Sequence, residues 1–186
     1  MGNEGMIPLE KARQEIEITC RRIALLHLAY AETIIKELGE EKGKKIIAKA
    51  IKDYGIKIGE KTKQEVQQMG LDTTPENFGK GRHYSTPSFG MQDKVVETVK
   101  NGEKREIAYG CVLAKTWKEW GQDELGRMYC YVDIAKYMAY NPDYKLIHLR
   151  TMTEGNRYCE LAVRSTTLKE KKDFFSTDKS WFYIDK

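Results

Sequence analysis

The chain has 186 residues, which is enough for one domain with a hydrophobic core and too short for a second independent core. Its 32 Lys and Arg residues exceed its 28 Asp and Glu residues by four, and the charges lie in mixed patches rather than in one basic stripe, which argues against a nucleic-acid partner. An apolar share of 40% with 32% charged residues excludes a disordered chain.

The N-terminal residues carry no basic region followed by an apolar run, so they do not form a secretory signal. The most apolar stretch, residues 23–35, is interrupted by His27 and Glu32 and is too short to span a bilayer. Four cysteines without close pairing are typical of reduced thiols in the cytoplasm. We therefore expect a cytoplasmic protein without disulfides or a membrane partner, and its oligomeric state stays open, a homo-oligomer included.

The first third of the chain predicts two helices. Apolar residues recur every three or four positions over residues 9–38, which is one face of a helix, and Gly39 is its C-terminal stop. A second helix is predicted over residues 40–69. Gly55 and Gly59 lie inside it, four positions apart, so they either admit a neighbouring element closely or mark a kink.

Residues 70–92 contain many glycines and prolines and predict a long connection, in which His83 is expected to be exposed. A hairpin follows, because two strand-like runs, 95–100 and 103–109, flank the Asn-Gly pair at 101–102, which is typical of a type I′ turn. This register places Val96 opposite Ile107 and gives Ile107, Tyr109 and Cys111 one common face.

Two connecting helices are predicted next, one after Gly110 and one over residues 123–139. A second hairpin joins residues 145–152 to 157–164. Of its two registers we prefer the one that places Leu161 opposite Leu149 rather than opposite His148, because it makes one face consistently aliphatic. Cys159 then points to the core with Leu161, and His148 points to the other face of its strand.

The predicted fold is α+β, with an N-terminal helical pair packed on an antiparallel sheet of about four strands in two hairpins, joined by two connecting helices. We predict one domain, residues 1–186, with a helical half (9–69), a long connection (70–92), a hairpin-helix-helix-hairpin half (93–165) and a C-terminal segment (166–186). The C-terminal segment is too aromatic for a free tail, so we expect it to pack on the domain or to form a partner surface.

The second half of the chain carries a specific, ordered set of motifs. They are Gly110-Cys111, Ala114, Trp117-Lys118-Glu119, Leu125-Gly126-Arg127, Tyr129-Cys130, Asp133, Asn141-Pro142, Glu154-Gly155-Asn156 and Cys159. The first half adds, less specifically, Arg21-Arg22-Ile23-Ala24, Gly39-Glu40-Glu41-Lys42-Gly43 and Tyr54-Gly55. Together these motifs resemble the L-2-amino-thiazoline-4-carboxylic acid hydrolase family, and the likeness extends over roughly residues 10–165.

The resemblance implies a hydrolase that opens a small cyclic C–N/C–S compound, a thiazoline carboxylate, to a carbamoyl-cysteine product. Cys111, Cys130, Cys159 and Asp133 are the expected catalytic set. Cys111 precedes a helix, whose exposed N–H groups lower a thiol's pKa, so it is the leading nucleophile. Asp133 lies three residues after Cys130 on one helix face and is the expected proton donor. Cysteines are also common as small buried hydrophobes, so a core role stays open for each.

Four further residues are predicted to contact the substrate: His27, Trp117, Tyr129 and Arg105. His27 lies on an apolar helix face, where it is either a hydrogen-bonded core residue or a base facing the pocket. Arg105 could pair with a substrate carboxylate, although its place near the hairpin turn also suits a solvated residue. The alternative function is a non-catalytic small-ligand or metal-binding module, in which Cys111, Cys130 and Cys159 hold a divalent metal such as zinc. No cofactor is otherwise expected.

Overall fold

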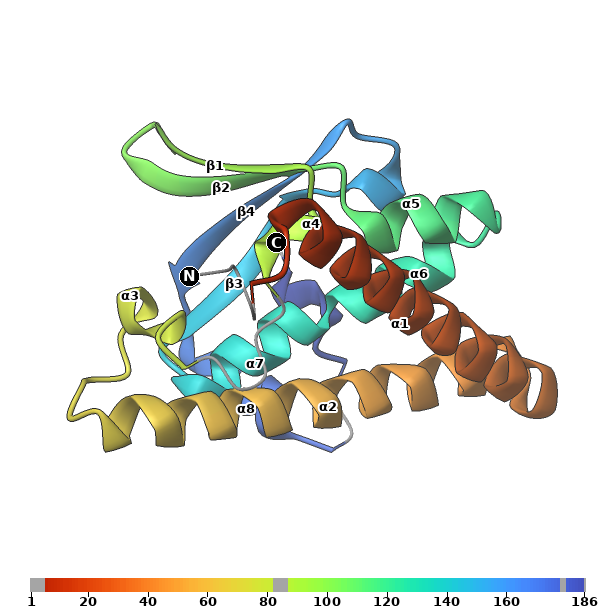
Figure 1. Ribbon diagram of the computed structural model, residues 1–186. Coiled ribbons are helices and arrows are strands. Elements are labelled where there is room, and N and C mark those ends of the chain that lie inside the picture. The colour runs from red at the N-terminus through yellow and green to blue at the C-terminus, as the bar shows by residue number, and fades with distance from the viewer. Residues whose placement is uncertain (1–5, 82–86, 178–179, 186) are drawn as a thin grey trace.

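The computed structural model describes residues 6–81, 87–177 and 180–185. His83, which was expected to be exposed, lies outside these residues. The fold is α+β, as predicted: one four-stranded antiparallel sheet in the order β1-β2-β4-β3 is covered on one side by the long helices (Figure 1). The sheet and those helices enclose the space in which the site forms.

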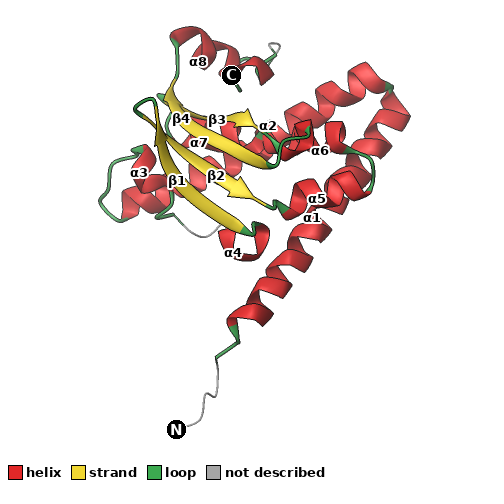
Figure 2. Ribbon diagram, turned by 90° about the horizontal axis from the view of Figure 1, so that it is seen from above, coloured by secondary structure: helices red, strands yellow, loops and turns green. Residues whose placement is uncertain are grey.

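The two N-terminal helices have the predicted bounds. Helix α1 spans Leu9–Leu38 and α2 spans Glu40–Gln68, and Gly39 between them has a φ of 79°, a left-handed conformation that glycine adopts without strain. Figure 2 shows the N-terminal half of α1 projecting beyond the sheet. None of the helices in the described part of the chain is long and apolar enough to cross a membrane.

Helix α2 runs unbroken through its two inner glycines, which serve as a contact surface for α7 (Val132–Tyr140). A Cβ atom on Gly55 would lie 2.5 Å from the Ala135 Cβ, and one on Gly59 would lie 2.2 Å from the Lys136 carbonyl oxygen. The close approach of a neighbouring element is thus confirmed, and no kink occurs there. This contact fixes α7, which carries Asp133.

The long connection contains two short helices, α3 (Pro75–Phe78) and α4 (Ser88–Met91). The Phe78 ring stacks on Tyr137 of α7 with centroids 4.2 Å apart. This contact holds α3 against the end of the helical layer.

The first hairpin, β1 (Lys94–Lys100) and β2 (Glu103–Tyr109), has the predicted turn and register. Asn101 and Gly102 both have positive φ, as a type I′ turn requires, and Val96 pairs with Ile107. Strand β2 then pairs with β4 in the middle of the sheet.

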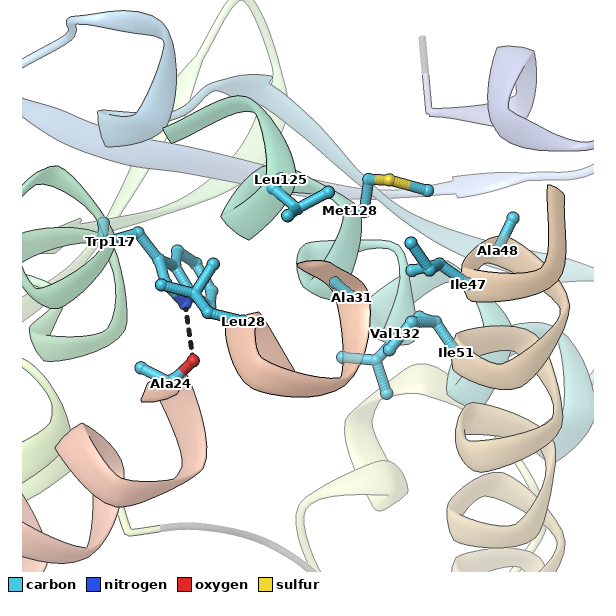
Figure 3. Packing of buried hydrophobic residues seen from close by; sticks show 11 residues of the cluster. Ala24, Leu28, Ala31, Ile47, Ala48, Ile51, Trp117, Leu125, Met128 and Val132 are labelled. Atoms are coloured by element: carbon cyan, nitrogen blue, oxygen red, sulfur yellow. Dashed lines mark hydrogen bonds between the residues drawn. The ribbon is translucent and has the colours of Figure 1, made fainter. Parts of the chain in front are cut away.

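Three helices, rather than two, connect the hairpins. Helix α5 (Val112–Glu119) agrees with the prediction, but the helix expected over residues 123–139 is divided at Tyr131 into α6 (Asp123–Cys130) and α7. The main core lies where these helices meet α1 and α2 (Figure 3). At its centre Trp117 is fully buried, and its Nε1 donates to the Ala24 carbonyl at 3.2 Å.

The predicted register of the second hairpin, β3 (Tyr144–Arg150) and β4 (Tyr158–Ser165), is wrong. Leu161 pairs with His148 instead of Leu149. A bulge after His148 and the 3-10 turn Met152–Glu154 lengthen the connection beyond the loop that we had expected. Ile147 lies on the face of β3 opposite to His148 and is fully buried. Since both faces of this strand are covered, the aliphatic pattern that we used to choose the register could not show which face meets the helices.

The C-terminal segment packs back on the domain. Helix α8 (Leu168–Phe175) begins with a capping box between Thr167 and Glu170, and the 3-10 turn Phe182–Ile184 follows. Its apolar side chains form a second core with α7, made of Ile134, Ala135, Met138, Phe174, Trp181 and Ile184.

Candidate functional site

One cavity of about 300 Å³ lies between the sheet and helices α1, α2 and α7. All four cysteines of the chain line it, as do charged residues from both layers. Its polar and sulfur-bearing lining residues are Cys20, Tyr54, Gln92, Glu106, Cys111, Tyr129, Cys130, Asp133, Lys136, His148 and Cys159. The structure therefore brings Cys111, Cys130, Cys159 and Asp133 to one place.

Cys111 reaches the cavity because the alternation of strand β2 is interrupted just before it. Gly110 has a φ of 67°, and a Cβ there would overlap the Asp93 carboxylate, so only glycine fits. This interruption corrects one expectation: Ala108 shares the cavity with Cys111, whereas Ile107 and Tyr109 point to the other face of β2.

Cys111 is the N-cap residue of α5 but makes no side-chain capping hydrogen bond. Burial raises the pKa of Cys111 to about 11 and outweighs the nearby backbone N–H groups of Ala114 and Leu113, which lower it, so the expected lowering of the pKa does not occur. Burial likewise raises the pKa of Cys130 and of Cys159, whose Sγ accepts a bond from the Met152 N–H at 3.4 Å. All three thiols are protonated at neutral pH.

Asp133 projects from α7 into the cavity. Its carboxylate oxygens lie 2.5 Å from the Lys136 Nζ and 3.2 Å from the His148 Nε2. Burial alone would raise the pKa of Asp133, but the Lys136 and His148 charges hold it well below its usual value. Asp133 is therefore an anion at neutral pH and does not suit the expected role of proton donor.

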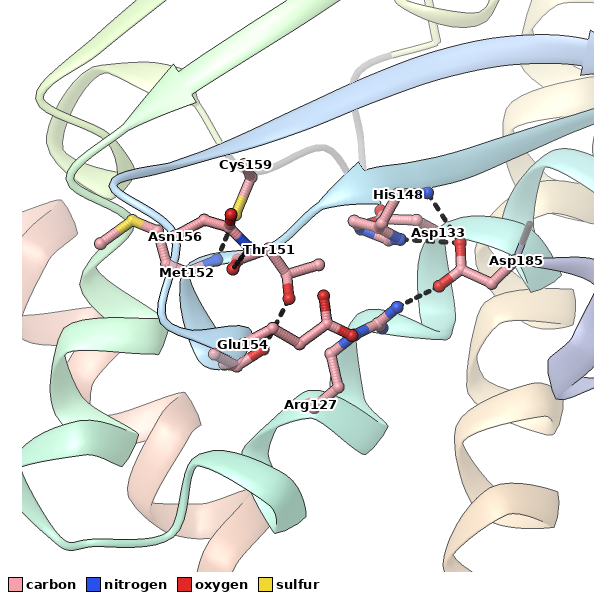
Figure 4. A network of polar contacts seen from close by, with 10 residues as sticks. Arg127, Asp133, His148, Thr151, Met152, Glu154, Asn156, Cys159 and Asp185 are labelled. Atoms are coloured by element: carbon pink, nitrogen blue, oxygen red, sulfur yellow. Dashed lines mark hydrogen bonds and ion pairs between the residues drawn. The ribbon is translucent and has the colours of Figure 1, made fainter.

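His148 lies between two carboxylates, as Figure 4 shows. Its Nε2 faces Asp133 and its Nδ1 lies 3.1 Å from the Asp185 Oδ1. Burial disfavours the charged imidazole, but the hydrogen bonds to the two carboxylates outweigh it and raise the pKa of His148 to about 9. The imidazole is thus protonated at neutral pH and can donate a proton into the cavity.

Two acceptors in the cavity wall, Glu106 and Gln92, have no hydrogen-bond partner within the described part of the chain. Glu106 makes no hydrogen bond or ion pair with any described residue, and desolvation together with the negative charge of Asp133 raises its pKa. Gln92 follows α4, and its Oε1 is buried without a hydrogen-bond partner among the described residues. An unpaired buried acceptor such as the Gln92 Oε1 is costly and is ready to accept an N–H group from a ligand, whereas the Glu106 carboxylate is solvent-exposed on its strand and reaches the cavity from its rim.

Of the four residues expected to contact substrate, only Tyr129 lines the cavity. His27 is a core residue: its Nε2 lies 2.9 Å from the Leu125 carbonyl oxygen, and its ring meets those of Trp117 and Tyr129 edge to face. Burial lowers the pKa of His27. Trp117 is buried in the same core, and Arg105 pairs with carboxylates outside the cavity, with Glu160 at 2.9 Å.

The residues that sequence reasoning missed are Cys20, Gln92, Glu106, Lys136 and His148. Lys136 had a recognisable signal, because it follows Asp133 by three positions on a helix. Glu106 and His148 could be found only from the correct strand faces, and these differ from the expected ones because of the positive φ of Gly110 and the register of β3 with β4. Over residues 6–81, 87–177 and 180–185, no group of three His, Cys, Asp or Glu side chains is placed to hold a metal ion.

A family model for L-2-amino-thiazoline-4-carboxylic acid hydrolase matches residues 19–163, most of the chain and every cysteine in the cavity. The chain belongs to this hydrolase family. No curated protein matches it. Among solved structures, one similar to this family member is a trafficking protein particle complex subunit 3 from Naegleria fowleri covalently bound to palmitic acid, at 12% identity over 81% of this chain and 96% of that chain, with a TM-score of 0.45. A likeness at that level carries no information about activity.

Proposed function

We propose that this protein is a hydrolase that opens a small thiazoline-carboxylate-like ring, with Cys111 as nucleophile. The observation that carries the proposal is the meeting of Cys111, the Asp133 carboxylate and the protonated His148 in one cavity. A thiol, an anion and a proton donor are the groups that a sulfur-for-sulfur exchange at an amidine carbon needs.

The cavity suits a small, polar, carboxylate-bearing ring. Its volume of about 300 Å³ is at the lower end for small-molecule sites. The Lys136 ammonium and the His148 imidazolium supply positive charge for a carboxylate. Gln92 and Glu106 supply the acceptors that the amino group and ring nitrogen of an amidine would use.

In the first step the Cys111 thiol adds across the C=N bond of the ring. The sulfur forms a bond to the amidine carbon, and the thiol proton passes to the ring nitrogen. This transfer to the basic substrate lets a thiol of raised pKa react without being ionised beforehand.

In the second step the bond between that carbon and the ring sulfur breaks. The His148 imidazolium protonates the departing sulfur and becomes neutral. A positively charged isothiouronium remains on Cys111, and the Asp133 carboxylate in the same wall stabilises its charge.

In the third step water adds to the isothiouronium carbon, and the neutral His148 takes a proton from it. The Cys111 sulfur then leaves with the remaining hydroxyl proton, which restores the thiol and releases a carbamoyl product. One water is consumed and one new substrate thiol appears per turnover, so protons and charges balance.

The experiment uses L-2-amino-thiazoline-4-carboxylate with the wild-type protein and Cys111→Ser. Thiol release in the deproteinised filtrate reports turnover, and intact-mass measurement after acid quenching reports the adduct. We expect turnover and a quenchable adduct on Cys111 in the wild type, and a loss of at least 1,000-fold in Cys111→Ser because a hydroxyl is a far weaker nucleophile.

Cys20→Ala is the matched control, since Cys20 lines the same cavity from α1 and has no role in these steps. Because Cys20→Ala changes only the volume of one side chain in the cavity wall, its turnover should stay within about threefold of the wild-type rate. A Cys111→Ser protein that turns over at the wild-type rate would remove Cys111 from the mechanism. Folded wild-type protein that releases no thiol would reject the activity.

A further inference from the structure

Asp185 belongs to the site although it lies beyond the residues that the family model matches, 19–163. It follows the 3-10 turn Phe182–Ile184, and its side chain is 3% exposed. Its Oδ1 accepts the His148 backbone N–H at 2.7 Å and lies 3.1 Å from the His148 Nδ1. Its other oxygen pairs with Arg127 of α6.

The two contacts of Asp185 with His148 satisfy a backbone N–H at the edge of the sheet and fix the orientation of the imidazole ring. Strand β3 is an edge strand, so the His148 N–H has no neighbouring strand to bond, and Asp185 takes that place. With Nδ1 held by Asp185, the ring presents Nε2 towards Asp133 and the cavity. A carboxylate behind a histidine fixes both its tautomer and its direction.

The segment that carries Asp185 is anchored independently of that carboxylate. Phe174, Trp181 and Ile184 are buried against α7, the helix that also carries Asp133. The two carboxylates that flank His148 therefore share one rigid support. This anchoring also means that a single change at Asp185 need not release the segment.

We propose that Asp185 is a positioning residue that orients the His148 ring and keeps it charged, so that the C-terminal segment completes a site built by the family core. The groups that act on His148 are Asp133 from α7, Asp185, and at one remove Lys136 and Arg127, each paired with one of those carboxylates. The catalytic meaning of this role rests on the proposed function; the positioning does not.

The test is an NMR titration of the His148 ring protons in the wild type and in Asp185→Asn, with His148→Gln used to assign the signal among three histidines. Asparagine keeps the shape and an acceptor oxygen but removes the charge. We expect the midpoint to fall from about 9 by at least one pH unit. The titration midpoint of His148 would not change in Asp185→Asn if the Asp185 side chain only filled space.

Asp173→Asn is the matched control. Asp173 lies on α8, accepts a hydrogen bond from the Tyr183 hydroxyl at 2.7 Å and is not one of the carboxylates that flank His148, so the midpoint should stay unchanged. Should Asp185→Asn unfold, Arg127→Gln gives a second test, because removing a cation next to Asp185 should raise the midpoint. An unchanged midpoint in folded Asp185→Asn, or a lowered one in Arg127→Gln, overturns the proposal.

The ring-opening assay gives a separate comparison. Asp185→Asn should lower kcat above neutral pH with little change in KM, because fewer molecules carry the imidazolium. If the wild type shows no turnover while the titration shifts as expected, the proposed function fails and the role of Asp185 stands.

Discussion

At the scale of single residues, the ionisation of His148 decides what the cavity can do. Asp133 is held as an anion and His148 as a cation, so His148, rather than Asp133, has the proton that the expected role of proton donor requires. Pairs of groups whose surroundings push their pKa values apart are typical of acid–base sites.

The charge on His148 predicts the alkaline limb of the pH profile. Turnover should be steady at neutral pH and fall about tenfold per pH unit above about 9, because only the imidazolium can protonate the departing sulfur. Steady-state rates from pH 6 to 10 measure this. His148→Gln should lose at least about 100-fold and show no such limb; a variant that keeps the limb would assign it to another group.

Gln92 offers a test of substrate recognition that also has a stability readout. Gln92→Leu removes a buried oxygen that no described residue hydrogen-bonds, so the free energy of unfolding should stay equal or rise by about 1 kcal/mol. In the assay KM should rise roughly tenfold, since one hydrogen bond to the substrate is lost. Urea titrations and steady-state kinetics check the two halves. A large loss of stability would show that the amide already has a partner.

At the scale of elements, the contact between α2 and α7 supports the site from behind. Gly59→Ala would place a methyl group 2.2 Å from the Lys136 carbonyl oxygen, so α7 must shift. We expect a loss of at least about 2 kcal/mol in unfolding free energy, although alanine is otherwise the better helix residue. Chemical denaturation followed by circular dichroism measures it.

The control for that change is Gly79→Ala, where φ is −70° and none of the neighbouring atoms in the described residues lies within 4 Å of the added methyl. It should be neutral or slightly stabilising. Gly59→Ala with unchanged stability would mean that the two helices can separate at little cost.

Elements that depend on local signals could be predicted from the sequence, and those set by long-range contacts could not. The bounds of α1 and the turn at Asn101 follow from periodicity and from turn chemistry, and both are confirmed. The break at Tyr131 has no glycine or proline to mark it. The bulge in β3 depends on pairing with β4, which no short window of sequence shows.

The residues of the candidate site also divide into those that the sequence identified and those that depend on long-range contacts. The family motif pointed to Cys111, Cys130, Cys159 and Asp133, and all of them line the cavity. His148 was missed because a change of one residue in register moves every side chain of a strand to the other face. Asp185 contacts His148 from a segment far along the chain, so only the tertiary fold reveals the pair.

For the whole molecule, the raised pKa of His148 predicts how stability depends on pH. The folded value, about 9, exceeds the ordinary 6.5, so the contribution is fully present below pH 6.5 and is lost as pH rises through 9. The shift corresponds to a fall of about 3 kcal/mol in unfolding free energy over this range. Denaturant titrations at pH 6 and pH 9 measure it. His148→Gln should flatten the profile, and an equally steep fall there would place the effect elsewhere.

Because every sulfhydryl of the chain opens into the same small chamber, chemical labelling of the native protein should depend on reagent size. A bulky maleimide that enters first would shield the remaining sites and stop at a single label. Iodoacetamide, being compact, would continue towards higher stoichiometry. Counting labels by mass before and after denaturation would therefore report the occupancy of the chamber directly, even for an occupant that undergoes no reaction.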